Sequence, residues 1–312
     1  MDRQNIKKKS QFLLAFDGSV HARASVSFLG DLITQQGIKT KSSVVILAVF
    51  TARQTGDLAP LQQALEQTLL YFKGKGIRAK SELVLGSPGE KILEYSEEIQ
   101  PALIVVGAKG LRATLGILLG GVAQQVVEYA SCPVLVVRAP YNGYRRILLV
   151  TDASPNSQNA KDYLASIRLS PITELSVMHV LPPIPIKPSP DFISHTWPTV
   201  PEMVPFYLNE LNEEEDAMLR EEEKAGQAIL QRAVHSLQES NSGVGIKSVI
   251  VRGDAASEII QYAKDHEIDL IVAGSRGESS IRSWLLGSVS RKLVHYTNCS
   301  VLIVKEPRGK NK

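Results

Sequence analysis

Short runs of consecutive apolar residues alternate along the chain with longer amphipathic stretches. Runs of this kind, rich in valine, isoleucine and leucine, are typical of strands that are buried on both faces of a parallel sheet and joined by helices. The predicted strands lie at residues 12–16, 44–50, 79–85, 103–106, 134–137, 147–150, 175–181, 246–251, 270–273 and 301–304. The pattern therefore predicts an α/β protein.

The order of these runs repeats along the chain. FLLAFDGS matches ILLVTDAS, ALIVVGAKG matches DLIVAGSRG, and SCPVLVV matches NCSVLIV. At four places the same residue type recurs 167 positions later along the chain, namely at Gly86, Gly107, Gly110 and Cys132. A constant offset predicts a tandem duplication. Asp17 and Asp152 are only 135 positions apart, so the second copy holds about 32 additional residues.

The repeat places a first domain at residues 1–140, a linker at 141–145 and a second domain at 146–312. The additional residues form an insertion at about 182–220, where eight of the chain's 16 prolines fall between positions 182 and 205. Such a segment cannot continue a helix or pair inside a sheet, and a long helix with an acidic outer face is expected behind it. The insertion is interpreted as a solvated loop, with a lid or a partner-docking element as the alternative.

Composition excludes several classes of protein. Of the 312 residues 44% are hydrophobic and 21% are charged, as in globular proteins, and no apolar run is long enough to span a membrane. A net charge of +3 is too small for a nucleic-acid-binding surface. The N-terminus has no apolar stretch of the signal-peptide kind. We expect a cytoplasmic protein that binds neither nucleic acid nor membrane, with Cys132 and Cys299 as buried thiols.

A glycine motif follows the fourth strand of each copy. In the second copy it has the form G-x2-G-x9-G-S, with Gly274, Gly277, Gly287 and Ser288. Glycines at a strand exit let backbone N–H groups approach an anion, and a helix that begins at Ser288 would favour phosphate. Asp152, at the end of the first strand, would flank this loop. Together these features indicate a nucleotide site, although each glycine alone could serve a turn and Asp152 an N-cap.

Several catalytic motifs are missing from the sequence. It contains no P-loop, no G-x-G-x-x-G and no G-x-S-x-G, and no Ser/His/Asp set recurs in both copies. No general base is identified, so a nucleotide-binding module without fast catalysis is the leading interpretation. The alternatives are a scaffold that binds partners without nucleotide, and a slow ATPase.

The chain resembles a tandem universal stress protein of the UspA family, over nearly all of both copies outside 182–220. The resemblance rests on FDGS and TDAS, on the G-x2-G-x9-G-S motif and on the CPVLVV-type final strand. It implies two five-stranded parallel-sheet sandwich domains of strand order 3-2-1-4-5, like those of the adenine-nucleotide alpha-hydrolases. It also implies ATP binding, a role in stress survival, and dimers formed through the fifth strands.

The resemblance also assigns site residues. In the second domain these are Asp152, Val180, Gly274, Arg276, Gly277, Gly287, Ser288 and Val289. In the first domain they are Asp17, Val49, Gly107, Lys109, Gly110, Gly120 and Gly121. Gly121 stands where the motif has serine, so the first site lacks one hydroxyl and is expected to bind more weakly. ATP is the expected ligand; AMP or ADP in its place, and an accompanying Mg²⁺, stay open.

The fifth strands carry an expectation about assembly. The runs from Val134 to Val137 and from Val301 to Val304 are apolar and should lie at sheet edges, where unpaired backbone groups invite another strand. Because the tandem link keeps the two copies at high effective concentration, we expect these strands to pair within one chain. A homodimer would then use other surfaces.

Overall fold

The structure, a computed structural model, describes residues 11–38, 42–51, 58–111, 119–184, 213–277 and 286–305. Each predicted apolar run is a strand there, with ends within about one residue of those predicted. The strands of the first repeat are β1 (Gln11–Ala15), β2 (Ser43–Phe50), β3 (Arg78–Leu85), β4 (Leu103–Gly107) and β5 (Val134–Val137). Those of the second are β6 (Arg146–Val150), β7 (Glu174–Leu181), β8 (Gly245–Arg252), β9 (Leu270–Gly274) and β10 (Ser300–Val304).

Helices connect the strands of each repeat. Those of the first repeat are α1 (Val20–Gln35), α2 (Ala59–Gly74), α3 (Pro88–Ile99) and α4 (Gly121–Tyr129). Those of the second are α5 (Pro155–Ser166), α7 (Glu213–Ser240), α8 (Ala255–Asp265) and α9 (Ser288–Tyr296). The alternation of strand and helix produces parallel pairing inside each repeat.

All ten strands belong to one sheet, in the order β3-β2-β1-β4-β5-β10-β9-β6-β7-β8. Each half of this order is 3-2-1-4-5, as the family resemblance implied. The two five-stranded halves join where β5 and β10 pair antiparallel, as expected for the fifth strands, and this pairing makes the sheet continuous. In this junction Val136 lies opposite Val301, and Val134 lies opposite Ile303.

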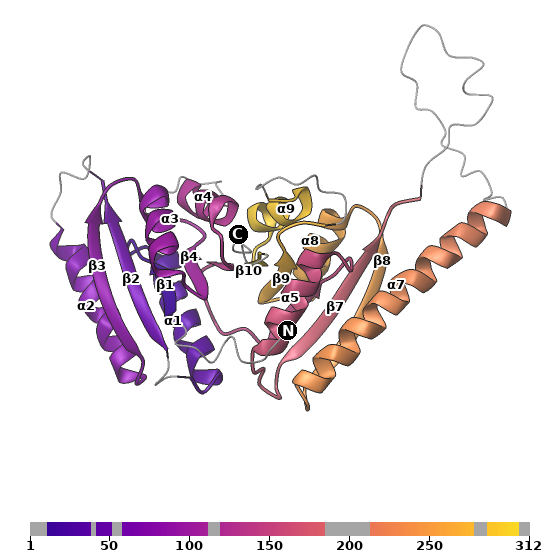
Figure 1. Ribbon diagram of the computed structural model, residues 1–312, viewed down its shortest axis with the longest axis horizontal. Helices are drawn as coiled ribbons and strands as arrows, with labels where there is room; N and C mark the ends of the chain where they lie inside the picture. Colours follow the sequence, from indigo (N-terminus) through magenta and orange to yellow (C-terminus); the bar gives the residue numbers. More distant parts are fainter. Residues whose placement is uncertain are drawn as a thin grey trace, which may run out of the picture.

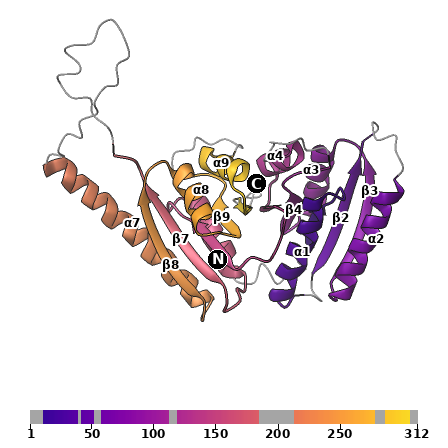
Figure 2. The same cartoon turned by 180° about the vertical axis from the view of Figure 1, so that it is seen from behind.

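Helices cover both faces of the sheet, with the two repeats side by side (Figures 1 and 2). Helices α1, α2, α5 and α7 contribute buried side chains to the core on one face. Helices α3, α4, α8 and α9 contribute to the core on the other. Both cores contain residues of both repeats, because the sheet between them is uninterrupted. The cores therefore extend across the junction instead of closing within each repeat.

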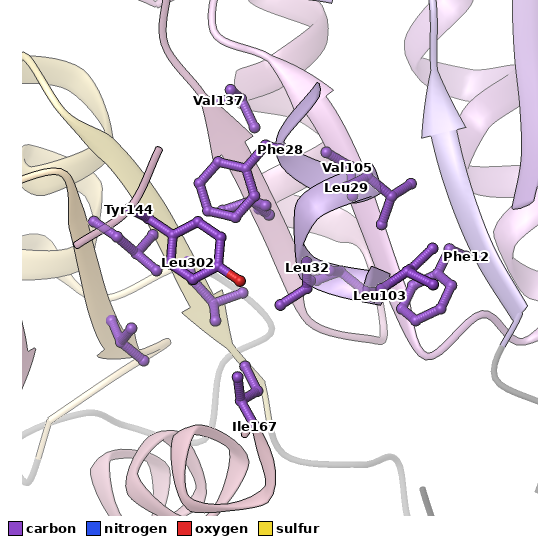
Figure 3. Close-up of a cluster of buried hydrophobic side chains, with 14 of the residues drawn as sticks. Phe12, Phe28, Leu29, Leu32, Leu103, Val105, Val137, Tyr144, Ile167 and Leu302 are labelled. Carbon is purple, nitrogen blue, oxygen red and sulfur yellow. The ribbon is translucent and has the colours of Figure 1, made fainter. Parts of the chain in front are cut away.

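The linker lies in this shared core (Figure 3). Tyr144 is buried and stacks on Phe28 of α1, with ring centroids 4.8 Å apart, and its hydroxyl donates to Gln35 Oε1 at 2.7 Å. Tyr141 also contacts Phe28, and its hydroxyl donates to Asp31 Oδ2 at 3.0 Å. The residues between the repeats are thus docked on α1 by both apolar and polar contacts.

Helix α7 is the long acidic helix predicted behind the insertion, and its first turn contains four carboxylates. It packs along β7 and β8 through Leu230, Ala233 and Leu237. Gly226 permits the close approach, because a Cβ there would lie 2.8 Å from Ile250 Cδ1. Most of the insertion, residues 185–212, lies outside the described residues. None of the described helices, α7 included, is both long and apolar enough to cross a membrane.

Candidate functional site

Each repeat has an Asp-x-Ser turn between its first strand and first helix. In the first repeat Ser19 caps α1, because its hydroxyl oxygen accepts from Ala22 N at 3.1 Å. The same hydroxyl donates to Lys109 O at 3.1 Å. Asp17 Oδ1 accepts from Ser19 N at 3.0 Å, and Oδ2 accepts from Leu111 N at 3.1 Å. The carboxylate therefore joins the start of α1 to the glycine loop after β4.

The second repeat has the same turn. Ser154 caps α5 by accepting from Ser157 N at 3.3 Å, and its hydroxyl donates to Arg276 O at 3.3 Å. Asp152 Oδ1 accepts from Ser154 N at 3.0 Å. The helix N-cap is therefore the serine, and the alternative in which Asp152 itself serves as N-cap is wrong.

The second glycine of each motif lies against this carboxylate. A Cβ at Gly110 would lie 2.6 Å from Asp17 Oδ2, and a Cβ at Gly277 would lie 2.6 Å from Asp152 Oδ2. Cβ atoms do not normally come this close to an oxygen, so glycine is what allows loop and carboxylate to meet. This arrangement follows from the pairing of β1 with β4 and of β6 with β9.

The first glycine of each motif has a packing role. A Cβ at Gly107 would lie 2.8 Å from the backbone carbon of His21, and a Cβ at Gly274 would lie 2.6 Å from that of Asn156. These glycines therefore allow α1 and α5 to pack closely against the ends of β4 and β9. Approach of an anion is not needed to explain them.

A cavity of about 330 Å³ opens at the carboxyl ends of β1, β2 and β4. Its wall contains all seven residues assigned to the first site: Asp17, Val49, Gly107, Lys109, Gly110, Gly120 and Gly121. The wall includes the apolar residues Phe16, Val49 and Ile92. It also contains Lys109 and the first residues of α4. A volume of this size is typical of a small-molecule site.

Sequence reasoning missed part of this wall. Pro88 and Ile92 reach the cavity from α3, and Leu47 and Thr51 reach it from β2 and the residue after it. The sequence does contain a signal for α3, because LVLGSPGEKI at 83–92 recurs as VIVRGDAASEI at 249–259. This recurrence marks the segment as part of the repeat but assigns it to no site.

The helices that follow the two glycine motifs both begin after a glycine. Gly120 is the N-cap of α4 and Gly287 that of α9, so neither helix has a side-chain cap. By contrast, a serine oxygen caps each of α1 and α5. The first-turn N–H groups of α4 and α9 have no acceptor within their own helix and lie at the positive end of the dipole. They are therefore suited to bind an anion.

The structure also places the residues assigned to the second site. Gly274 ends β9 against α5, Arg276 and Gly277 follow in the loop, where Gly277 lies beside Asp152, and Gly287 N donates to Ser275 O at 2.9 Å. Ser288 and Val289 form the first turn of α9. Val180 lies on β7, opposite Val251. Residues 278–285 of this loop lie outside the described residues.

His21 connects the first site to the junction between the repeats. Its Nδ1 accepts from Ala139 N at 2.9 Å, which requires the neutral imidazole. Burial lowers the pKa of His21, and the positive charges of Lys109 and Arg138 lower it further. The ring therefore stays neutral beside the cavity. The equivalent residue of the second repeat is Asn156, which cannot titrate.

The contact between Gly110 and Asp17 leads to a stability prediction. Gly110→Ala should displace the carboxylate and break its bond to Leu111 N, at a cost of about 1–3 kcal/mol in the free energy of unfolding. Gly121→Ala is the matched control, because a Cβ there has no atom within 4 Å. It should leave stability unchanged or slightly higher. Urea unfolding of both variants measures the difference, and equal midpoints would contradict the role assigned to Gly110.

Both cysteines are free thiols, as expected, but each is only partly buried. Burial raises the pKa of Cys132 and of Cys299 to about 11, so both thiols stay protonated. Among the described residues, no group of three or more histidine, cysteine or carboxylate side chains could hold a metal ion.

Comparison with known proteins identifies the family. Residues 10–138 and 143–305 each match the universal stress protein family. Universal stress protein YxiE of Bacillus subtilis is 32% identical over 162 residues, which are 52% of this chain and 99% of the relative. A universal stress protein structure from Archaeoglobus fulgidus covers 97% of this chain and 100% of its own, with a TM-score of 0.60 at 20% identity, and supports the fold. The chain therefore belongs to the universal stress protein family and carries two copies of its domain.

Proposed function

We propose that the first-repeat cavity binds an adenine nucleotide and that the chain acts as a nucleotide-responsive module of the general stress response, without fast catalysis. ATP is the proposed ligand, with AMP or ADP as alternatives. The main support is the convergence of all seven assigned residues on one cavity of about 330 Å³.

The apolar residues of the cavity wall fit a purine ring. Val49, Phe16 and Ile92 offer aliphatic and aromatic surface, and burial of apolar area there favours binding. Asp17 lies at the same end of β1, but both of its oxygens already accept backbone N–H groups. We therefore propose that the main role of Asp17 is to shape the loop. It would contact ribose only through the lone pairs that these two hydrogen bonds leave available.

The polar groups of the cavity wall fit phosphate. Gly121 and Val122 in the first turn of α4 line the cavity, and Lys109 supplies a positive charge. Each amide and the ammonium would donate to phosphate oxygens, and charge-assisted hydrogen bonds are the stronger kind. The phosphates and water would supply most ligands to an accompanying Mg²⁺, as is usual for this ion.

The second repeat supports a second site of the same kind. Asp152, Arg276, Gly277 and Gly287 repeat the first-site arrangement, and Ser288 adds the hydroxyl that Gly121 lacks. For this reason we propose that the second site binds the nucleotide more tightly.

We also infer that the pairing of β5 with β10 persists in solution, so that one chain holds the two-domain assembly. The proposed domains are residues 1–140 and 146–312, with the linker at 141–145. Two observations support these bounds. The linker is docked on α1 through the hydroxyls of Tyr141 and Tyr144. Relatives such as YxiE match over 162 residues, which is about the length of one repeat. The free thiols fit the proposed cytoplasmic location.

Lys109→Met tests the proposed function. It should weaken ATP binding at the first site by about tenfold or more, because a charge-assisted hydrogen bond to phosphate is lost. Binding of adenosine, which has no phosphate, should not change. Calorimetry with both ligands measures the difference.

Lys91→Met is the matched control, because Lys91 is a lysine of α3 that pairs with Glu94 outside the cavity wall. It should bind ATP as the original protein does. Absence of any ATP binding, or equal losses in the two lysine variants, would contradict the proposed site. Absence of binding would favour the scaffold interpretation, and steady ADP production would favour a slow ATPase.

A further inference from the structure

A lysine of the second repeat holds a helix of the first. Lys305 directly follows β10, and its ammonium group donates to Ala130 O at 2.7 Å and to Glu128 O at 2.9 Å. These carbonyls lie at the C-terminal end of α4, where backbone oxygens lack helical partners and the dipole is negative. A cation there stabilises the helix end and fixes its position relative to β10.

An arginine of the first repeat makes the reciprocal contact. Arg138 directly follows β5, and its Nη2 donates to Val294 O at 2.8 Å near the C-terminal end of α9. It is almost fully buried. Arg138 and Lys305 are 167 positions apart, so they are equivalent residues of the repeat. Each repeat therefore supplies one cation to the last helix of the other.

In each of these two helices the candidate phosphate site lies at the N-terminal end, and the cation of the other repeat binds near the C-terminal end. Gly121 and Val122, in the first turn of α4, line the cavity, and Ser288 begins α9. Each helix has only nine residues, a length of about 14 Å, over which a short helix moves as a rigid unit. Helices α4 and α9 lie on either side of the centre of the molecule (Figures 1 and 2). A shift at one end of either helix therefore displaces its other end.

A third contact joins the two helices. Arg291 of α9 forms an ion pair with Glu128 of α4, with Nη2 and Oε1 3.1 Å apart. The same Nη2 lies 3.4 Å from Leu286 O, one residue before Gly287. The equivalent ion pair does not exist in the other direction. The position equivalent to Arg291 is Gln124, and the position equivalent to Glu128 is His295. The C-terminal end of α4 is thus connected to the glycine motif of the second repeat.

We propose that Lys305 and Arg138 are positioning residues for the nucleotide site of the opposite repeat, and that the two sites are coupled through α4 and α9. This proposal rests on the proposed function. Binding at the first site fixes the N-terminus of α4, and the contacts at its other end transmit that constraint to β10 and to α9. Occupancy of one site then changes the affinity of the other, and the coupling is reciprocal.

Lys305→Met tests the proposal without requiring ligand. The variant keeps the apolar stem and removes the charge at the end of α4. Hydrogen exchange of the unliganded protein should become faster at the hydrogen-bonded amides of α4, such as Gln124 N, which donates to Gly120 O, and should change much less in α9. Lys305→Arg should restore the original rate, because it restores a cationic donor. Lys292→Met is the control, since Lys292 pairs with Asp254 within the second repeat.

ATP titration followed by the same exchange measurement reports on each glycine motif separately. Lys305→Met should require about tenfold more ATP to protect the first motif, and Lys305→Arg should bind as the original protein does. Unchanged exchange and unchanged protection at α4, or equal losses at both motifs, would overturn the proposal. If ATP protects neither motif of the original protein, the proposed function fails. In that case the hydrogen-exchange rate of α4 in the unliganded Lys305→Met variant decides whether Lys305 positions this helix.

Discussion

Gly121→Ser should raise the affinity of the first site for ATP by about 10- to 100-fold. A Cβ at this position meets no atom within 4 Å, so the hydroxyl enters open space at the first residue of α4. There it would donate to phosphate, as we propose for Ser288 in the second repeat. A hydrogen bond to a charged group contributes about 1.5–3 kcal/mol, and a 10- to 100-fold change in affinity is about 1.4–2.8 kcal/mol.

Two further variants complete this experiment. Ser288→Gly should weaken the second site by a similar factor, and Gly121→Ala should leave the first site unchanged because it adds the Cβ without the hydroxyl. Calorimetry or site-resolved hydrogen exchange measures the affinities. Equal affinities for the alanine and serine variants at position 121 would show that the hydroxyl does not reach the phosphate.

Charges in the junction should separate the repeats. Val136 and Ile303 are 1% and 0% exposed and lie in the core shared by both repeats. The double variant Val136→Asp, Ile303→Asp places two unpaired carboxylates there, at a cost above about 4 kcal/mol. We expect the melting temperature to fall by about 10 °C or more, and the scattering profile to show an extended chain or aggregates.

Leu85→Asp provides the control for this experiment. Leu85 ends β3 at the outer edge of the same sheet, and 55% of its surface is exposed. The same change of side chain should therefore have little effect on melting. A double junction variant with the original scattering profile and melting temperature would contradict pairing between the repeats in solution.

The strands were predictable because burial on both faces leaves continuous apolar runs such as the one from Val134 to Val137. The joining of two sheets into one was harder to predict in detail, because it depends on contacts between distant residues. Tyr144 stacks on Phe28, and Arg138 and Lys305 reach across the junction, yet none of these residues belongs to a recognisable motif.

The candidate site was predictable in its residues but less so in their roles. The spacing of the glycine motif placed Gly107 and Gly110 together, but the sequence could not show that the Cβ position of Gly107 is taken by the backbone of α1. The sequence likewise could not show that Gly287 lies close to its own loop, where a Cβ would be 3.2 Å from Arg276 Cα.

A crystal structure of the protein grown with ATP and Mg²⁺ tests the central claim most directly. We predict that the purine lies between Val49 and Ile92 in the first-repeat cavity, and that the phosphates lie at Lys109 and the first turn of α4. Nucleotide bound at another surface, or a cavity that contains only water at saturating ATP, would contradict the account.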